Sequence, residues 1–281
     1  MTPLIACAVL VAAVTHAGWN AIAHGIKDQL VAFTLLETGG MLCGLLLASF
    51  APLPAAEAWP YLIGSVAIHI TYMCLLMQSF RLGDFGQVYP IARGIAPLVV
   101  TVLAAVFVGE VPGPWQTAGV VVASAGLGGV ALWGMRGSQG QGLAVLAAVG
   151  TGLTIAAYTV VDGVGVRASG TSLGYTAWLL LIMGVLLPAG AFAVRGGQLA
   201  AQLRPVAVRG LLGGVLSVFA YGLVLWAQTR AELAPVAALR ETSIIAGAVI
   251  GAVLFKERFG APRVVAAALV VAGIGLMLHG G

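Results

Sequence analysis

Two arginines lie deep inside apolar segments of this 281-residue chain, where a permanent charge is costly. Arg93 lies in "YPIARGIAPLVV" (residues 89–100), and Arg240 lies in "LAPVAALRETSII" (residues 233–245). A guanidinium group does not lose its charge in a protein, so at this depth it faces either a cavity or an anionic partner. Its planar donors can bind a carboxylate or a phosphate with two parallel hydrogen bonds. We therefore expect Arg93 and Arg240 to flank a central cavity and bind a substrate anion. The alternative is that each forms a static ion pair that stabilises the bundle.

Acidic residues in the apolar segments are candidates for proton binding. Glu37 lies nine residues into one such segment, and Glu241 directly follows Arg240. Neighbours on a helix point about 100° apart, so Glu241 does not simply neutralise Arg240. A carboxyl group in a partly desolvated site can bind a proton near neutral pH, so Glu37 and Glu241 are predicted to couple transport to protons, with a static salt bridge as the alternative. Asp162 is expected to pair with Arg167 at the membrane interface instead.

Aromatic and polar side chains recur on shared helical faces near these charges. Residues three or four positions apart on a helix are neighbours. In a helical bundle, such faces line either a cavity or a hydrogen-bonded contact between helices. We predict that they contribute to substrate binding. The residues are His16, Trp19 and Asn20; His69 and Tyr72; Tyr89, one turn before Arg93; and Tyr158, one turn before Asp162.

The composition requires a membrane protein. Hydrophobic residues make up 60% of the chain and charged residues only 8%, whereas soluble domains carry about 25% charged residues. Apolar runs of roughly 20 residues, the length that spans a bilayer, recur along the chain. The basic residues sit singly at the ends of these runs, so the net charge of +4 indicates membrane orientation and not nucleic-acid binding. We predict an all-α, multi-pass protein of a bacterial-type inner membrane. Its ten helices are expected at 3–24, 29–50, 59–81, 85–108, 114–135, 142–165, 172–194, 209–229, 233–255 and 263–279, with a short turn in the connection 195–208.

The second half of the chain repeats features of the first. A shift of 147 residues gives nine identities over the 38 positions 93–130, a level that apolar helices also reach by chance, so the matched charges are the stronger evidence. Five helices are an odd number, so a second copy enters the membrane from the opposite side. We therefore predict two inverted five-helix repeats, residues 1–137 and 138–281, with the binding site where they meet. The matched pairs are Arg93 and Arg240, Glu110 and Glu257, Gly113 and Gly260, and, at a shift of 149, Tyr72 and Tyr221, and Arg81 and Arg230.

The distribution of basic residues predicts the orientation. Loops after odd-numbered helices carry nine of them, and loops after even-numbered helices carry two. Cytoplasmic loops are enriched in Lys and Arg, so both termini are predicted to lie outside the cytoplasm. The nine are Lys27, Arg81, Arg136, Arg195, Arg204, Arg209, Lys256, Arg258 and Arg263, and the two are Arg167 and Arg230.

Each half ends in a helix, an acidic loop and a glycine-rich helix: "FVGEVPGPWQTAGVVVASAGLGGVAL" (107–132) and "LFKERFGAPRVVAAALVVAGIGLML" (254–278). This pattern resembles EamA-type members of the drug/metabolite transporter superfamily, and Pro97 looks like the proline of the family's fourth helix. The second half departs from the pattern, with Ile244 in register with Pro97 and Lys256 in place of the loop glycine. The resemblance implies a ten-helix fold and transport, but the family's substrates range over amino acids, sugars, nucleotide conjugates and drugs. Glu110 and Glu257 match the family's loop acid, and we expect them to cap helices.

Motifs for other chemistries are missing from the sequence. It has no GxxxxGK[ST] for ATP and no HExxH, Cys/His cluster or GxSxG for metal or serine hydrolysis, so we expect no cofactor and no enzymatic activity. An intramembrane transferase that uses His16, His69 and Asp162 is the alternative of another class, but it predicts catalytic residues that do not repeat. A passive anion channel is a third option.

The sequence thus predicts a secondary active transporter that exports small polar metabolites by alternating access. Amino acids or other carboxylate-bearing compounds are the expected substrates, with protons as the coupling ion and a monomer as the functional unit. The alternative substrates are phosphorylated or cationic, drug-like metabolites.

Overall fold

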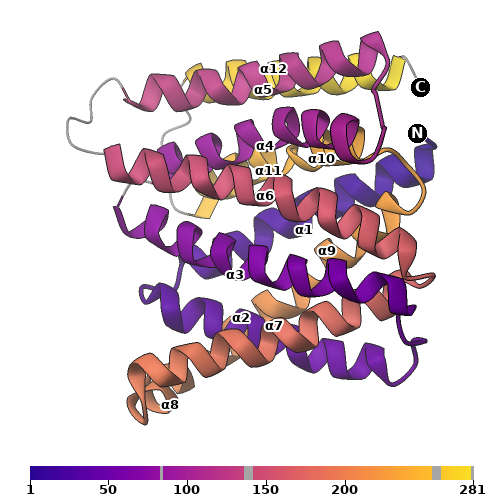
Figure 1. Cartoon of the computed structure of the whole chain (residues 1–281). Helices are drawn as coiled ribbons and strands as arrows, with labels where there is room; N and C mark the ends of the chain where they lie inside the picture. The colour runs from indigo at the N-terminus through magenta and orange to yellow at the C-terminus, as the bar shows by residue number, and fades with distance from the viewer. Residues whose placement is uncertain (83–84, 136–141, 255–260, 280–281) are drawn as a thin grey trace.

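The chain folds into a bundle of long helices. The computed structural model describes the backbone of residues 1–82, 85–135, 142–254 and 261–279, and this part contains no β-strand. The α-helices have the following bounds: α1 (Pro3–His24), α2 (Gln29–Ala48), α3 (Trp59–Leu82), α4 (Phe85–Phe107), α5 (Pro114–Met135), α6 (Gly142–Ala168), α7 (Ser172–Arg195), α8 (Gln198–Leu203), α9 (Ala207–Gln228), α10 (Leu233–Arg240), α11 (Ser243–Leu254) and α12 (Ala261–His279), with 3₁₀ turns η1 (Ala56–Ala58) and η2 (Arg204–Val206) (Figure 1).

The ten predicted helices are confirmed, with one change. Nine of them begin and end within three residues of the predicted positions in the described part of the chain, and the short turn expected in the connection 195–208 is α8 with η2. The predicted helix 233–255 is instead broken at Glu241 and Thr242 into α10 and α11. Irregular backbone at membrane depth is tolerated where protein surrounds it or where it lines a cavity.

Residues at the break stabilise the end of α10. The Thr242 hydroxyl donates to the carbonyl oxygen of Leu239 at 2.8 Å, so it satisfies one of the carbonyl groups that a helix end leaves unpaired. Arg240 lies in the last turn of α10, where a cation interacts favourably with the helix dipole. Glu241 is the C-cap residue of α10 and lies two positions before the first residue of α11. The charge of Arg240 and the hydroxyl of Thr242 therefore stabilise the end of α10 at this interruption.

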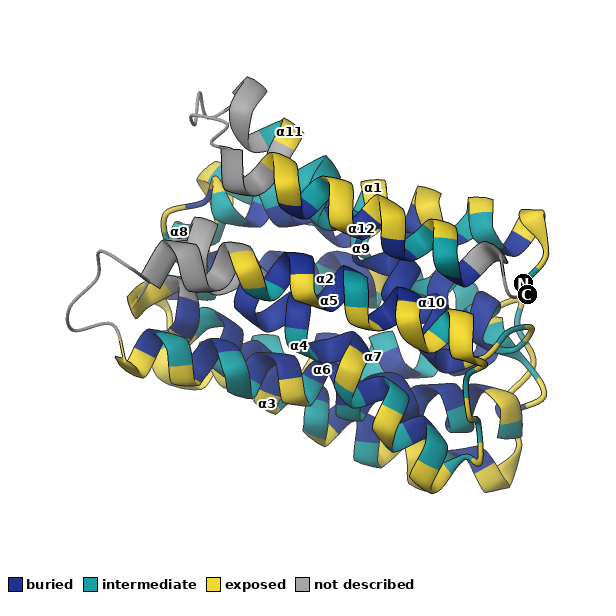
Figure 2. Cartoon of the chain, turned by 90° about the horizontal axis from the view of Figure 1, so that it is seen from above, coloured by how far each residue is buried: buried dark blue, intermediate teal, exposed yellow. Residues whose placement is uncertain are grey.

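The surface of the bundle is apolar and suits lipid. Large hydrophobic residues such as Leu46, Phe107 and Val194 are more than half exposed, and the exposed positions lie on the outside of the bundle while the buried ones face inward (Figure 2). In water, so much apolar surface would drive association. In the described part of the chain, six helical segments are long and apolar enough to cross a membrane, and Ile91–Phe107 and Val264–Met277 are shorter apolar helices. The protein is a multi-pass membrane protein.

Helices from the two halves of the chain pack against each other more than against their own half. The most extensive contacts join α5 to α12, α2 to α7, α3 to α6, α1 to α9, and α4 to α6. Glycine permits the closest of these approaches. A Cβ atom at Gly273 would lie 2.5 Å from the carbonyl oxygen of Gly119, and one at Gly39 would lie 2.7 Å from that of Leu211. Such small residues allow helix backbones to meet in a membrane, where hydrophobicity does not drive helices together.

Polar contacts join the helix ends at both ends of the bundle. At the end that carries α8 (Figure 1), Arg195 donates to both carboxylate oxygens of Asp28, at 2.7 and 3.1 Å, and to Gln202 at 2.6 Å. Hydrogen bonds from Arg195 hold the pKa of the Asp28 carboxyl below its ordinary value. At the opposite end, where α1 begins and α12 ends, Arg167 forms an ion pair with Glu110. The middle of the bundle, between these two layers, holds the buried charges.

Candidate functional site

A small cavity lies in the middle of the bundle between helices of both halves. Its volume is ≈ 70 Å³, enough for a few water molecules or a small polar group. Helices α1, α2, α3, α6, α7, α9 and α10 each contribute to its wall. Apolar residues such as Met73, Leu179 and Met183 form part of the lining. The polar and aromatic residues of the lining are His16, Trp19, Glu37, His69, Tyr72, Tyr158, Ser217, Tyr221 and Arg240.

Arg240 brings an incompletely satisfied positive charge to this cavity. The residue is only 3% exposed, and its Nε atom is buried without a hydrogen-bond partner in the described part of the protein. Its Cζ lies 6.0 Å from the ring centroid of Tyr158, at the limit of a cation–π interaction. A buried donor without an acceptor costs about 1–3 kcal/mol, and more for a charged group. The site is therefore suited to receive an anionic acceptor.

Aromatic rings of α3, α6 and α9 form one wall of the cavity. The His69 ring stacks on Tyr158 at 4.1 Å, and Tyr221 meets His69 edge to face at 5.7 Å. His69 Nδ1 lies 3.0 Å from the carbonyl oxygen of Ser65 and 3.1 Å from its hydroxyl oxygen, so this nitrogen is engaged within α3. This wall presents apolar ring faces together with a few polar atoms, as small-molecule sites commonly do.

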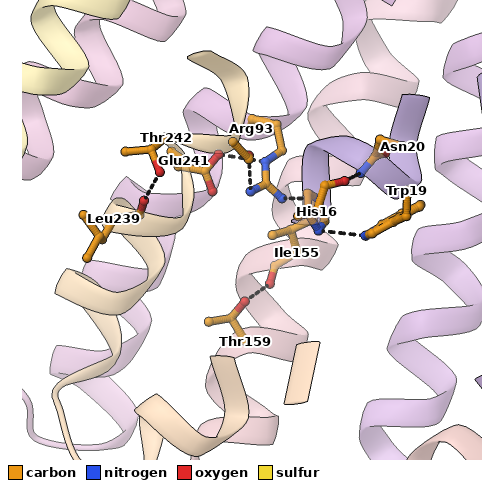
Figure 3. A network of polar contacts seen from close by, with 10 residues as sticks. His16, Trp19, Asn20, Arg93, Ile155, Thr159, Leu239, Glu241 and Thr242 are labelled. Atoms are coloured by element: carbon orange, nitrogen blue, oxygen red, sulfur yellow. Dashed lines mark hydrogen bonds and ion pairs between the residues drawn. The ribbon is translucent and has the colours of Figure 1, made fainter. Parts of the chain in front are cut away.

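Arg93 lies behind the cavity wall and is paired. Its Nε donates to Glu241 Oε2 at 2.7 Å (Figure 3). Its Nη2 donates to the Ser243 hydroxyl at 3.4 Å. Both members of the ion pair are almost completely buried. Arg93 in α4 is thus held by residues at the break between α10 and α11, and the ion pair joins the two halves of the chain there.

His16 separates Arg93 from the cavity. Trp19 Nε1 donates to His16 Nδ1 at 3.2 Å, and because an indole N–H can only donate, the proton of the neutral imidazole lies on Nε2. That Nε2 atom is 3.5 Å from Arg93 Nη1 (Figure 3). Asn20 donates to the backbone carbonyl of His16 at 2.8 Å, so its side chain amide is used within α1. On this face of α1, His16 and Trp19 therefore line the cavity, whereas the Asn20 side chain is bonded to its own helix.

Asp162 does not pair with Arg167, so that prediction was wrong. Its carboxylate is fully buried and accepts hydrogen bonds from the hydroxyl groups of Tyr175, at 2.8 Å, and Tyr221. Two neutral phenol donors satisfy its two oxygens, and Tyr221 connects it to the cavity wall. A tyrosine on another helix has no fixed spacing from Asp162 in the sequence, whereas Arg167 lies close to Asp162 on the same helix.

A scan against family models matches residues 142–279, the second half of the chain, to the EamA-like transporter family. The second half of the chain belongs to this family. The protein is a membrane transporter of small molecules, and the resemblance noted in the sequence is confirmed. Because members of the family are transporters, the transferase alternative is not retained. Comparison with curated proteins finds no match.

Solved structures support the fold of this EamA-like transporter over its whole length. One, titled only "Crystal structure of protein", is 16% identical, has a TM-score of 0.70, and covers 99% of this chain and 96% of its own. An identity this low supports the fold alone, and that fold includes both halves, whereas the family model covers only the second.

The loop acid of this EamA-like transporter caps a helix, as expected, but not a helix adjacent in the chain. Glu110 accepts the backbone N–H of Leu233 at 2.7 Å, at the start of α10, and an Arg167 donor at 2.5 Å. Arg167 also donates to the carbonyl oxygens of Gln228 and Ala231. The ionic contact of Arg167 thus joins the loop after α4 to the segment before α10. Glu257 lies outside the described residues.

The predicted site residues fall into three groups. His16, Trp19, Glu37, His69, Tyr72, Tyr158 and Arg240 line the cavity, whereas Asn20, Arg93 and Glu241 are not in its lining. Tyr89 lies in α4, but its side chain is outside the described part. The sequence prediction missed Tyr221 and Ser217 as lining residues. A signal for Tyr221 was present, because it matches Tyr72 at the repeat shift of 149 residues.

Proposed function

We propose that this EamA-like transporter is a secondary active exporter of small carboxylate-bearing metabolites, such as amino acids. The observation that carries the proposal is Arg240, a buried guanidinium group with an unpartnered Nε at a central cavity. A substrate carboxylate supplies the acceptor that this group lacks. Glu37 lines the same cavity and offers an acceptor for an ammonium group. The small volume and the aromatic wall favour compact substrates.

An inverted repeat of residues 1–137 and 138–281 is part of the proposal. In this repeat, α6 is the counterpart of α1, α7 that of α2 and α9 that of α3. Exchanging counterparts relates the contact between α3 and α6 to that between α9 and α1, and the contact between α2 and α9 to that between α7 and α3. All four contacts are present. Glycine packing follows the same exchange at a shift of 147 residues. A Cβ atom at Gly126 would meet the Ala266 carbonyl at 3.2 Å, and Gly273 faces that of Gly119 in the equivalent way. Two such halves that rock about a central site provide alternating access.

Glu37 is the proton carrier in this proposal. Its side chain lines the cavity and makes no hydrogen bond or ion pair with the described residues. Glu241, the second candidate, is held by Arg93 at 2.7 Å. Protonation of Glu241 would leave the buried Arg93 charge without a counter-charge, which is costly. A carboxyl group open to the cavity can exchange its proton with whichever side the cavity faces.

The proposed location is a bacterial-type inner membrane, with the protein acting as a monomer and both termini outside the cytoplasm. The excess of basic residues in the loops after odd-numbered helices supports this orientation. A reporter that is active only in the cytoplasm should give no signal when fused to Gly281. The same reporter placed after Arg204, in the connection between α7 and α9, should be active. A strong signal from the Gly281 fusion contradicts the orientation.

Uptake into proteoliposomes tests the substrate class. Purified protein should accumulate one or more labelled amino acids when a pH gradient is imposed, and it should not accumulate phosphorylated metabolites or lipophilic cations. Empty liposomes and liposomes with the Arg240→Ala variant are the controls. Accumulation of a phosphorylated compound or a cation without any amino acid contradicts the proposal and supports the alternative substrate classes.

A further inference from the structure

Arg93 and Arg240, which the proposed repeat relates, differ in whether the protein supplies a hydrogen-bond partner for Nε. The Nε atom of Arg93 is bonded to a carboxylate of the protein, that of Glu241. The same atom of Arg240 has no partner in the described part of the chain. The two residues are 147 positions apart, the repeat shift, so equivalent groups occupy unequal environments. This asymmetry has to come from residues that the repeat does not share.

Position 94 explains the asymmetry. Under the repeat shift, the counterpart of Glu241 is Gly94. A Cβ atom at Gly94 would lie 2.8 Å from the Cβ atom of Leu127, closer than real Cβ contacts allow, so an acidic side chain does not fit there. The first half thus supplies no equivalent carboxylate to Arg240.

We propose that Glu241 determines the charge selectivity of the transporter. Its carboxylate binds Arg93 in the same way as a substrate carboxylate binds Arg240. The protein itself supplies a hydrogen-bonded carboxylate to Arg93 and leaves the Nε of Arg240 for the ligand. The site therefore selects compounds with a single carboxylate and rejects those with two. This inference rests on the proposed function, since it assumes that Arg240 binds the substrate carboxylate.

The position of His16 makes Glu241 relevant to the ligand. His16 lines the cavity and contacts Arg93 Nη1 at 3.5 Å, so one imidazole ring separates the Arg93 charge from the ligand space. If Glu241 lost its charge, Arg93 would attract an anion in the cavity through this thin wall. At present the ion pair cancels most of that attraction. Glu241 then acts on selectivity without touching the ligand.

The Glu241→Gln variant tests the inference with L-alanine and L-aspartate, which differ by one carboxylate. Binding to the detergent-solubilised full chain is measured by isothermal titration calorimetry. The wild type should bind L-alanine more tightly than L-aspartate. An added unit charge roughly 10 Å from an anion, at an effective dielectric constant of about 20, strengthens its binding about ten- to twentyfold. Both ligands also carry an ammonium group, so L-alanine has no net charge and L-aspartate has one net negative charge. The variant should therefore raise the aspartate-to-alanine affinity ratio about tenfold.

Two further variants make the result decisive. Glu110→Gln removes a carboxylate from another arginine ion pair, that with Arg167, which is not in the cavity lining, and should leave the ratio unchanged. If Glu241→Gln does not fold, the double variant Arg93→Gln, Glu241→Gln removes both charges and should keep the wild-type ratio. An unchanged ratio in Glu241→Gln, or loss of L-alanine binding in the double variant, overturns the inference while the proposed function stands. If the wild type binds neither amino acid, the proposed function fails as well.

Discussion

The Arg240→Lys variant should bind substrate about 10- to 150-fold more weakly than the wild type, with little change in melting temperature. Lysine keeps the positive charge but lacks the planar pair of donors that matches a carboxylate. A hydrogen bond to a charged group contributes about 1.5–3 kcal/mol, which gives this range of affinity. Arg240 Nε has no hydrogen bond to lose, because it is unpartnered in the described structure. Stability should therefore depend little on the replacement.

Arg93→Lys is the matched control for this prediction. Arg93 is held by Glu241 and Ser243, so its replacement should lower the melting temperature first and affinity less. Arg93→Gln should be more severe, because removing one partner of a buried ion pair typically destabilises a protein by about 3–5 kcal/mol. Affinity and melting temperature are measured for the same detergent samples. Unchanged affinity in Arg240→Lys, together with a large drop in its melting temperature, contradicts the assignment of Arg240 to the substrate.

Accumulation driven by a pH gradient should be abolished in the Glu37→Gln variant, while exchange of labelled for unlabelled substrate continues. Glutamine keeps the size and much of the hydrogen-bonding capacity of glutamate but does not bind and release a proton in the physiological range. Glu37 lines the cavity, so its loss uncouples proton movement from substrate movement without closing the substrate path. Both activities are measured in the same proteoliposomes, with and without an imposed gradient.

Glu57→Gln is the control for Glu37→Gln. Glu57 lies in η1 and is exposed, so its replacement should leave both gradient-driven uptake and exchange at wild-type levels. Full gradient-driven accumulation by Glu37→Gln places the proton carrier elsewhere or shows that transport does not use protons. Loss of both activities in Glu37→Gln indicates that substrate binding itself requires the charge of Glu37.

The helices of this transporter could be predicted closely from the sequence, because each membrane span is a long apolar run that ends at glycine, proline or charge. The interruption at Glu241 and Thr242 could not, since the apolar run continues past it without proline. The only local signal is the polar sequence "RETS" (240–243) in an apolar segment. Thr242 competes for a backbone carbonyl there, an effect that depends on the surrounding bundle and not on helix periodicity.

The buried charges were easier to find than their partners. Arg93 and Arg240 are conspicuous in the sequence because charge is rare in apolar segments. That Arg93 binds Glu241, 148 residues away, and that Asp162 binds Tyr175 and Tyr221 depends on how the halves are packed. The proposed repeat relates the two arginines to each other but carries no information on a residue, such as Glu241, that only one half possesses.

The packing of helices from one half against those of the other has a consequence for biosynthesis. Helices α1 to α5 share modest contacts among themselves apart from α4 with α5, and their principal contacts are with α6, α7, α9 and α12. Translation delivers the N-terminal helices first. Each can insert into the membrane as a separate stable span, but it meets its main packing partner only after the later helices have emerged. Until then, the buried Arg93 has no Glu241 to pair with, so the nascent protein holds an uncompensated charge in the membrane.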